Sequence, residues 1–150
     1  MAKARQGVGK LAIIPAETNV LVASAGDEAL LGKACADLSD WPMRWRYEEA
    51  DIAPGRAIVA VFKPFLLDLL HRKVSKTTFN RDRLNLWQVG GAMIQFRHGD
   101  PALKRLPIDT LIRDMIEEEG GPLLWPRISE SEQKALDATC RKLYRFLNRP

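Results

Sequence analysis

The sequence predicts a mainly α-helical protein built around a compact four-helix bundle over residues 55–148. Apolar residues recur at helical spacing through most of that region. Ser75 and the pair Ser129 and Glu132 supply side chains that cap helix N-termini. With 150 residues and 46% hydrophobic content, the chain has the size and composition of one soluble globular domain.

The residues ahead of the bundle divide into an arm and an N-terminal segment. Residues 1–10 are basic and lack periodicity, so we expect a flexible arm there. The segment 11–54 begins with two short apolar runs, 11–14 and 19–23. Either run fits a short strand or an edge packed on the core.

The rest of the N-terminal segment contains one expected helix and a connector. The helix opens at Asp27 and stops near Asp40. Residues 41–55 then fit an ordered connector or a short strand. Pro54-Gly55 is the strongest turn signal and marks the expected boundary of the bundle.

The first two bundle helices are joined by a short turn. The first begins at Arg56 and carries a wide apolar stripe, with Pro64 expected to kink it or to start its second half. The second follows the capping Ser75, and residues 99–101 end it because a proline disfavours helix in the residue before it. Gly90 lies on its apolar side, where it would let another helix approach.

The last two bundle helices are expected over 107–121 and from 129 to about 148. Gly120-Gly121 should end the former. Ser129 and Glu132 form a capping box at the start of the latter.

Charge is unevenly distributed along the chain, although the formal net charge is only +4. Residues 72–105 hold eight bases against Asp82 and Asp100, and residues 134–150 hold five against Asp137. Acidic stretches lie before and between these blocks. The two basic stretches therefore have two possible roles. They could form one positive face of the folded domain, or their helices could pair with the acidic helices.

Catalytic and metal-binding signatures are scarce. His71 and His98 have no neighbouring cysteine or carboxylate at metal-ligand spacing, and residues 7–10 carry only a fragment of a phosphate-loop motif. Residues 117–119 are three successive glutamates, which point in different directions on a helix. We therefore expect no catalytic residue, no metal site and no cofactor, and the protein is not expected to be an enzyme.

The sequence predicts a cytoplasmic location. No apolar run approaches the about 18 residues that cross a bilayer, and the basic start lacks the unbroken apolar stretch of a signal peptide. Cys35 and Cys140 fit small apolar core residues in a reducing compartment.

The second bundle helix carries the strongest functional pattern. On an ideal helix a row of polar residues without acids spans an arc of about 80°; it consists of Thr77, Arg81, Asn85, Gln88 and Gln95. Arginine, asparagine and glutamine donate to purine edges, and threonine can bind phosphate. Lys73 and Lys76 precede the row. It predicts either a nucleic-acid contact or an ordinary solvated face.

The last helix repeats the pattern with a row of bases opposite its apolar side. The row comprises Lys134, Arg141, Lys142, Arg145 and Arg149. Such a row would meet phosphates through charge and give salt-sensitive binding. Its alternatives are a solvated face or docking on an acidic protein.

A short motif at the second bundle helix carries a family resemblance. In "VSKTTF", Ser75, Thr78 and Phe79 match a leucine-serine-x-x-threonine-apolar motif, with Val74 in place of leucine. Residues 56–97 thereby resemble the core-binding, SAM-like domain of tyrosine recombinases and phage integrases. The resemblance implies a SAM-like four-helix plan and a helical module that clamps DNA.

The chain also departs from that family. Asp82 stands where the family usually has an aromatic residue, and residues 98–101 do not form its His-x-x-Arg box. The catalytic half is absent, so Tyr144 is expected to be structural.

We therefore expect a small, non-catalytic DNA-binding protein. Its phosphate contacts would come from Lys73, Lys76, Arg81, Arg141 and Arg145, with Thr77 beside them and Asn85 and Gln88 as base readers. The alternative is a helical protein-interaction module, such as an adaptor or an inhibitor belonging to a phage or mobile element, which meets an acidic partner. Residues 41–47 would then supply aromatic and arginine anchors, unless those aromatics belong to the core.

Overall fold

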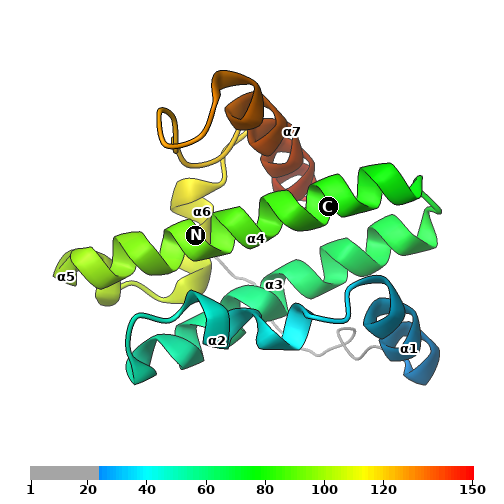
Figure 1. Ribbon diagram of the computed structural model, residues 1–150, viewed down its shortest axis with the longest axis horizontal. Helices are drawn as coiled ribbons and strands as arrows, with labels where there is room; N and C mark the ends of the chain where they lie inside the picture. The colour runs from blue at the N-terminus through cyan, green and yellow to red at the C-terminus, as the bar shows by residue number, and fades with distance from the viewer. Residues whose placement is uncertain (1–23) are drawn as a thin grey trace. The chain divides into compact units, whose positions relative to one another are not determined.

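The computed structural model describes residues 24–150, and every regular element within them is helical (Figure 1). The chain divides into two compact units, residues 1–36 and 37–150. The expected arm and both short apolar runs lie outside the described residues. The prediction of a mainly helical protein is confirmed for the part that is described.

The helix of the N-terminal segment is α1, Ala25–Ala34, and it differs from expectation at both ends. It begins earlier because Ser24, rather than Asp27, is its N-cap: the Ser24 hydroxyl accepts the N–H of Asp27 at 3.0 Å. It ends earlier because Cys35 leaves the helical conformation. A separate 3₁₀ turn, η2, spans Leu38–Asp40.

The expected connector is largely helical and contains no strand. It forms α2, Trp41–Trp45, and the 3₁₀ turn η3, Glu49–Asp51. The carboxylate of Asp51 accepts the backbone N–H groups of Tyr47 and Glu48 and so caps this turn. Helix α3 follows at once, so Pro54 and Gly55 lie inside its first turn rather than in a linker.

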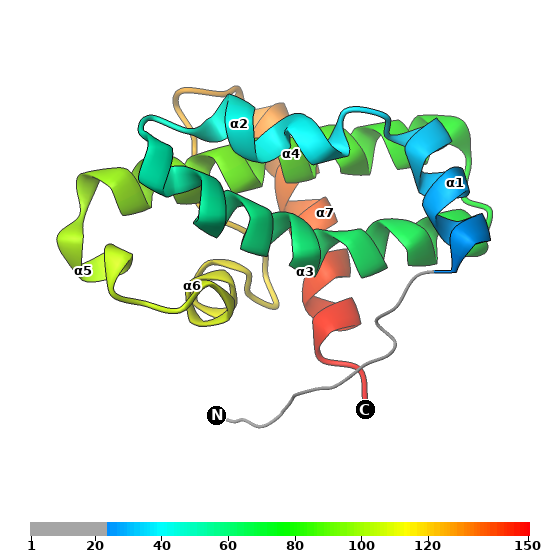
Figure 2. The same ribbon diagram turned by 90° about the horizontal axis from the view of Figure 1, so that it is seen from below.

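Helices α3, Ile52–His71, and α4, Lys76–Gly99, form a long hairpin and lie side by side in both views (Figures 1 and 2). Helix α3 continues through Pro64. As predicted, Ser75 caps α4 by accepting the N–H of Thr78 at 3.1 Å. Lys73 occupies the turn with a φ of 57°, the left-handed conformation typical of the residue after a helix end.

The chain then forms α5, Pro101–Lys104, and α6, Ile108–Met115. The expected helix over 107–121 is too long, because Ile116 is extended and residues 117–120 close a turn. In that turn Glu117 and Gly120 exchange both backbone hydrogen bonds, at 2.8 and 3.2 Å.

Helix α7, Glu130–Leu147, begins with the predicted capping box. The Ser129 hydroxyl accepts the N–H of Glu132 at 3.0 Å, and the Glu132 carboxylate accepts the N–H of Ser129 at 2.8 Å. These hydrogen bonds lower the pKa of Glu132 below its usual value. The cap is therefore complete above the usual pKa of a glutamate and is lost as the pH falls through the lowered value.

Helix α2 packs on α3 and α4, α6 packs on α3, and α7 crosses α4. Figure 2 shows α2 on one side of the α3–α4 pair and α6 on the other. The side chains with less than 2% exposure include Trp41, Ile58, Phe62, Phe65, Leu66, Leu69, Leu86, Met93, Ile94, Leu111, Ile112 and Ile116. One apolar core therefore joins α2, α3, α4 and α6.

The close approach predicted at Gly90 occurs, and the neighbour is Trp45 of α2. Trp45 is 6% exposed, and its indole N–H donates to the carbonyl of Trp87 at 3.0 Å. A Cβ atom on Gly90 would overlap the Trp45 ring. Trp41 and Trp45 are thus core residues, and of the aromatic residues in 41–47 only Tyr47 is exposed.

Replacing Gly90 with alanine should destabilise the fold, because the buried Trp45 ring is held on α4 and has little room to move. We expect Gly90→Ala to lower the free energy of unfolding by about 1 to 3 kcal/mol, as overpacking typically does. Urea denaturation followed by circular dichroism measures this.

The matched control is Gly32→Ala, since a Cβ atom on this exposed helical glycine meets nothing within 4 Å. It should leave stability unchanged or raise it by up to about 1 kcal/mol. Equal effects of the two substitutions would contradict the tight packing of Trp45 on Gly90.

Candidate functional site

A buried polar cluster fixes α7 on α4. Asp82 is 0% exposed, and its carboxylate accepts the Thr139 hydroxyl at 2.6 Å and the Lys142 ammonium at 2.8 Å. One turn further along α4, the Asn85 amide donates to the carbonyl of Ala135 at 3.1 Å and to Thr139 at 2.9 Å. Buried polar groups require such partners, so the cluster determines where α7 crosses α4.

Because α7 crosses α4, the residues of the predicted polar row have different environments. The expected base-reading role of Asn85 is not supported, because both hydrogens of its amide are donated to α7. Gln88 and Gln95 lie beside an apolar groove on another face of α4. Thr77 and Arg81 are exposed, as expected. The helical period alone cannot show which part of a polar row a neighbouring helix covers.

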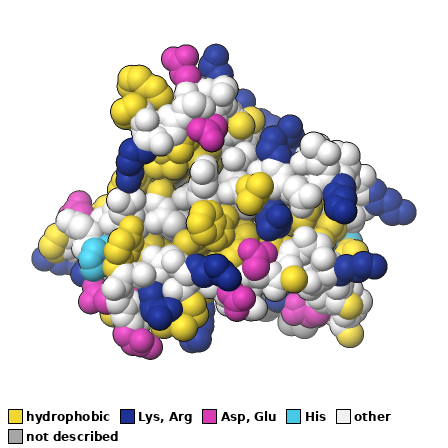
Figure 3. All heavy atoms as spheres, viewed as in Figure 1, with side chains coloured by type: hydrophobic (Ala, Val, Ile, Leu, Met, Phe, Trp, Pro, Cys, Tyr) yellow, Lys and Arg dark blue, Asp and Glu magenta, His cyan; other side chains and the backbone are white. Residues whose placement is uncertain are grey.

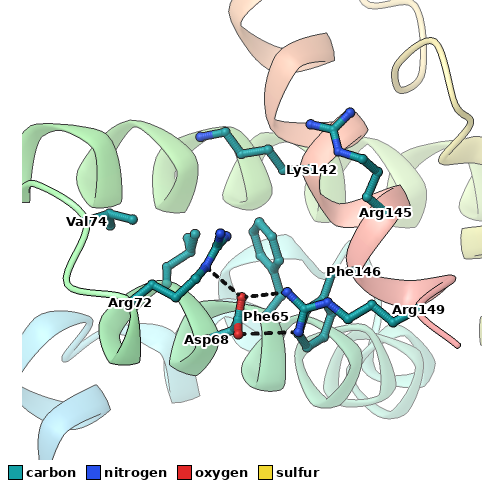
Figure 4. A pocket seen from close by; sticks show the side chains of 9 residues that line it. Phe65, Asp68, Arg72, Val74, Lys142, Arg145, Phe146 and Arg149 are labelled. Atoms are coloured by element: carbon teal, nitrogen blue, oxygen red, sulfur yellow. Dashed lines mark hydrogen bonds and ion pairs between the residues drawn. The ribbon is translucent and has the colours of Figure 1, made fainter.

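Cationic side chains gather instead where the end of α3 meets the end of α7. Figure 3 shows Lys and Arg side chains around the α3–α4 turn. A pocket of about 360 Å³ opens between these elements. We call it the cationic pocket; its walls are Phe65, Asp68, Leu69, Arg72, Val74, Lys142, Arg145, Phe146 and Arg149 (Figure 4).

One carboxylate positions two of the four cations. Asp68 accepts the Arg72 Nε at 3.2 Å and the Arg149 Nη2 at 3.1 Å. The Arg149 guanidinium also lies over the Phe146 ring, 4.6 Å from its centre. Phe146 in turn meets Phe65 of α3 edge to face at 5.7 Å. The end of α7 is thus attached to α3 by aromatic and charged contacts together.

The other two cations differ in how they are held. Lys142 is paired with the buried Asp82, whereas Arg145 is exposed and has no hydrogen bond or ion pair with another described residue. Lys73 and Lys76, also exposed, lie on either side of Val74 in the chain. Of the predicted phosphate-binding residues, Arg145 lines the pocket, and Lys73 and Lys76 lie close in the chain to its lining residue Val74.

Arg72, Lys142 and Arg149 line the same pocket but were not among the predicted phosphate contacts, although the predicted basic row of the last helix included Lys142 and Arg149. The i,i+4 spacing of Asp68 and Arg72 was visible in the sequence, and so was the basic end of the last helix. Neither pattern reveals that the two helix ends meet. Arg141 lies elsewhere, and its guanidinium donates to the carbonyl of Glu119 at 3.1 Å.

His98 lies in a second cluster that sequence spacing cannot show. Its Nδ1 is 3.4 Å from a carboxylate oxygen of Glu48 and 3.8 Å from one of Asp51, and its ring stacks on Tyr47. The two carboxylates and the imidazole ring lie close enough together to ligate one metal ion. Contacts within the protein already satisfy the two carboxylates: Lys104 pairs with Glu48, and two backbone N–H groups donate to Asp51. The position of these residues therefore has a structural explanation without a metal ion.

The two predicted core cysteines are buried. Burial and the nearby Asp137 raise the pKa of Cys140 to about 12, so this thiol stays protonated near neutral pH and is a poor nucleophile. In the described part of the chain, no helix combines the length and apolar composition needed to cross a bilayer.

A shallow apolar groove runs along a different face of α4. We call it the tryptophan groove; it has a volume of about 210 Å³ and is lined by Trp45, Trp87, Gln88, Gly91, Ala92, Gln95, Leu124, Arg127 and Ile128. One wall is the loop before α7, which Gln133 holds by accepting the N–H groups of Leu124 and Trp125 at 2.7 and 3.0 Å. Trp87 lines the groove and is 39% exposed.

The Asp82 cluster should contribute strongly to stability. We expect Asp82→Ala to lower the free energy of unfolding by about 2 to 3 kcal/mol, because it leaves Lys142 and Thr139 without their shared acceptor. Asp114→Ala removes the same charge from an exposed position and should change stability by less than about 0.5 kcal/mol. Denaturant titrations of the two variants decide this, and similar midpoints would contradict a structural role for Asp82.

Comparisons of the chain with protein-family models, with curated proteins and with solved structures gave no match.

Proposed function

We propose that the protein binds DNA without catalysis, through phosphate contacts at the cationic pocket and the adjoining α3–α4 turn. The observation that carries this proposal is that Arg72, Lys142, Arg145 and Arg149 line one pocket in which Asp68 is the single lining carboxylate. Exposed Lys73 and Lys76 extend the positive surface along the turn. Clustered lysine and arginine side chains are the usual electrostatic footprint of a nucleic-acid-binding protein.

The cations of the pocket suit a phosphate ligand. Arginine presents a planar fork that matches phosphate oxygens, and two of the three pocket arginines are pre-positioned by Asp68. Among the described residues, Arg145 has no hydrogen-bond or ion-pair partner to give up before it contacts a ligand. Binding would neutralise phosphates and release counterions, which makes the affinity depend steeply on salt.

The recombinase resemblance supports the same proposal. Ser75 caps α4 and bonds to Thr78, so two residues of the shared motif form the start of a long helix beside the basic turn. We propose that residues 55–148 adopt the SAM-like plan of the core-binding domain and act as its DNA-clamping module. A cytoplasmic location, where DNA is accessible, belongs to the same proposal.

Removing charge at the proposed surface should weaken binding to a short duplex of any sequence. We expect Lys73→Gln combined with Arg145→Gln to lower the affinity and to reduce the slope of log affinity against log salt by about 2. Fluorescence anisotropy at several salt concentrations measures both quantities.

The matched control combines Lys134→Gln with Arg105→Gln, which removes two exposed cations from outside the pocket. It should retain the wild-type slope. The proposal fails if the wild-type protein does not bind duplex DNA even at low salt, or if both double variants lose affinity equally.

The tryptophan groove favours a second function, binding of a protein partner. Trp87 lines it and is 39% exposed, and aromatic side chains in shallow grooves are common interface anchors. The basic flank formed by Arg127 suits an apolar helix with acidic residues.

If this second function holds, an acidic amphipathic helical peptide should bind with an affinity that depends little on salt. Trp87→Ala should weaken that binding at least about tenfold, as loss of an aromatic anchor does, while Leu123→Ala, at an exposed site outside the groove, should not. Isothermal titration calorimetry measures this, and unchanged affinity in Trp87→Ala would exclude the groove.

A further inference from the structure

The cationic pocket is a recess rather than a flat row of charges. Its volume of about 360 Å³ lies in the range of small-molecule sites, about 300 to 1,000 Å³. A continuous phosphodiester backbone follows an open track of cations, such as the exposed lysines of the adjoining α3–α4 turn, along which successive phosphates can lie. A recess of this size instead admits one phosphate together with the group that carries it.

The charge of the pocket favours a doubly charged group. Four cations line it against the carboxylate of Asp68, and the buried Asp82 pairs with Lys142, which leaves an excess of two positive charges. A phosphate monoester carries about −1.5 to −2 at neutral pH, whereas each internal phosphodiester carries one negative charge. The additional charge of a monoester increases its attraction to a cluster of four cations.

The cations are arranged before any ligand arrives. Asp68 holds Arg72 and Arg149 (Figure 4), and the buried Asp82 holds Lys142. These carboxylates reduce the ordering cost of binding, which is the general advantage of a pre-organised site. Arg145 is the only one of the four lining cations without a described partner and is therefore free to turn toward the ligand.

The remaining walls are apolar. Phe65, Leu69, Val74 and Phe146 line the pocket beside the charged groups. A free inorganic phosphate would leave this surface uncovered, whereas a sugar or base attached to the phosphate would cover it. The pocket thus combines charge for a phosphate with apolar surface for its carrier.

We propose that the cationic pocket binds a phosphate monoester on a small organic body, either the terminal 5′-phosphate of a DNA strand or a free nucleotide. Binding of a terminal 5′-phosphate rests on the proposed DNA-binding function, and the protein would then recognise the ends of DNA strands. Binding of a free nucleotide does not depend on DNA binding.

The decisive experiment compares two short duplexes that differ only in carrying a 5′-phosphate or a 5′-hydroxyl. We expect the phosphorylated duplex to bind about tenfold more tightly, since hydrogen bonds to a charged group contribute at least that factor. Arg145→Gln should remove the preference. Lys134→Gln, which removes the same charge from an exposed position on the same helix but outside the pocket, should keep it.

A second arm adds a nucleoside monophosphate or inorganic phosphate as competitor. If strand ends and nucleotides share the pocket, the nucleotide should displace the phosphorylated duplex at lower concentration than inorganic phosphate does. Equal affinity for both duplexes, with no effect of the nucleotide, overturns the pocket assignment but leaves DNA binding standing. Nucleotide binding that Arg145→Gln abolishes, without duplex binding, supports the pocket and overturns the DNA-binding function.

Discussion

The buried carboxylate of Asp82 is the constraint on which the cationic pocket depends. A fully buried charge is costly unless it is paired, and Asp82 is satisfied by the Thr139 hydroxyl and the Lys142 ammonium of a single helix. Asn85 strengthens the same contact from the next turn of α4. Helix α7 is thereby fixed in position and rotation, and its last turn reaches α3.

The position of α7 brings its basic C-terminal end next to the basic C-terminal end of α3, so that both line the cationic pocket. Asp68 of α3 then meets Arg149 of α7, and Phe65 meets Phe146, so charged and aromatic contacts close the same junction. Arg145, which none of these contacts uses, faces the recess between the helices. The repulsion between the gathered cations is offset by Asp68 and Asp82, and the net positive charge that remains is available for an anionic ligand.

Much of the fold was predictable because the signals were local. The caps at Ser75 and Ser129 and the apolar periodicity of the helices depend on residues three or four positions apart. The early end of α6, the covering of Asn85 and the meeting of Arg72 with Arg149 depend on residues far apart in the chain. Periodicity showed which helices carry cations, but only the packing of α7 showed which cations share a pocket.

The most direct measurement of the central claim is a heteronuclear NMR titration that follows the guanidinium Nε–H signals of the arginines and the indole signals of the tryptophans. With a 5′-phosphorylated strand as ligand, a phosphate site at the end of α7 predicts shifts at Arg72, Arg145 and Arg149 and little change at Trp87. Shifts confined to Trp87 and Trp125, with the three arginines unmoved, would contradict it.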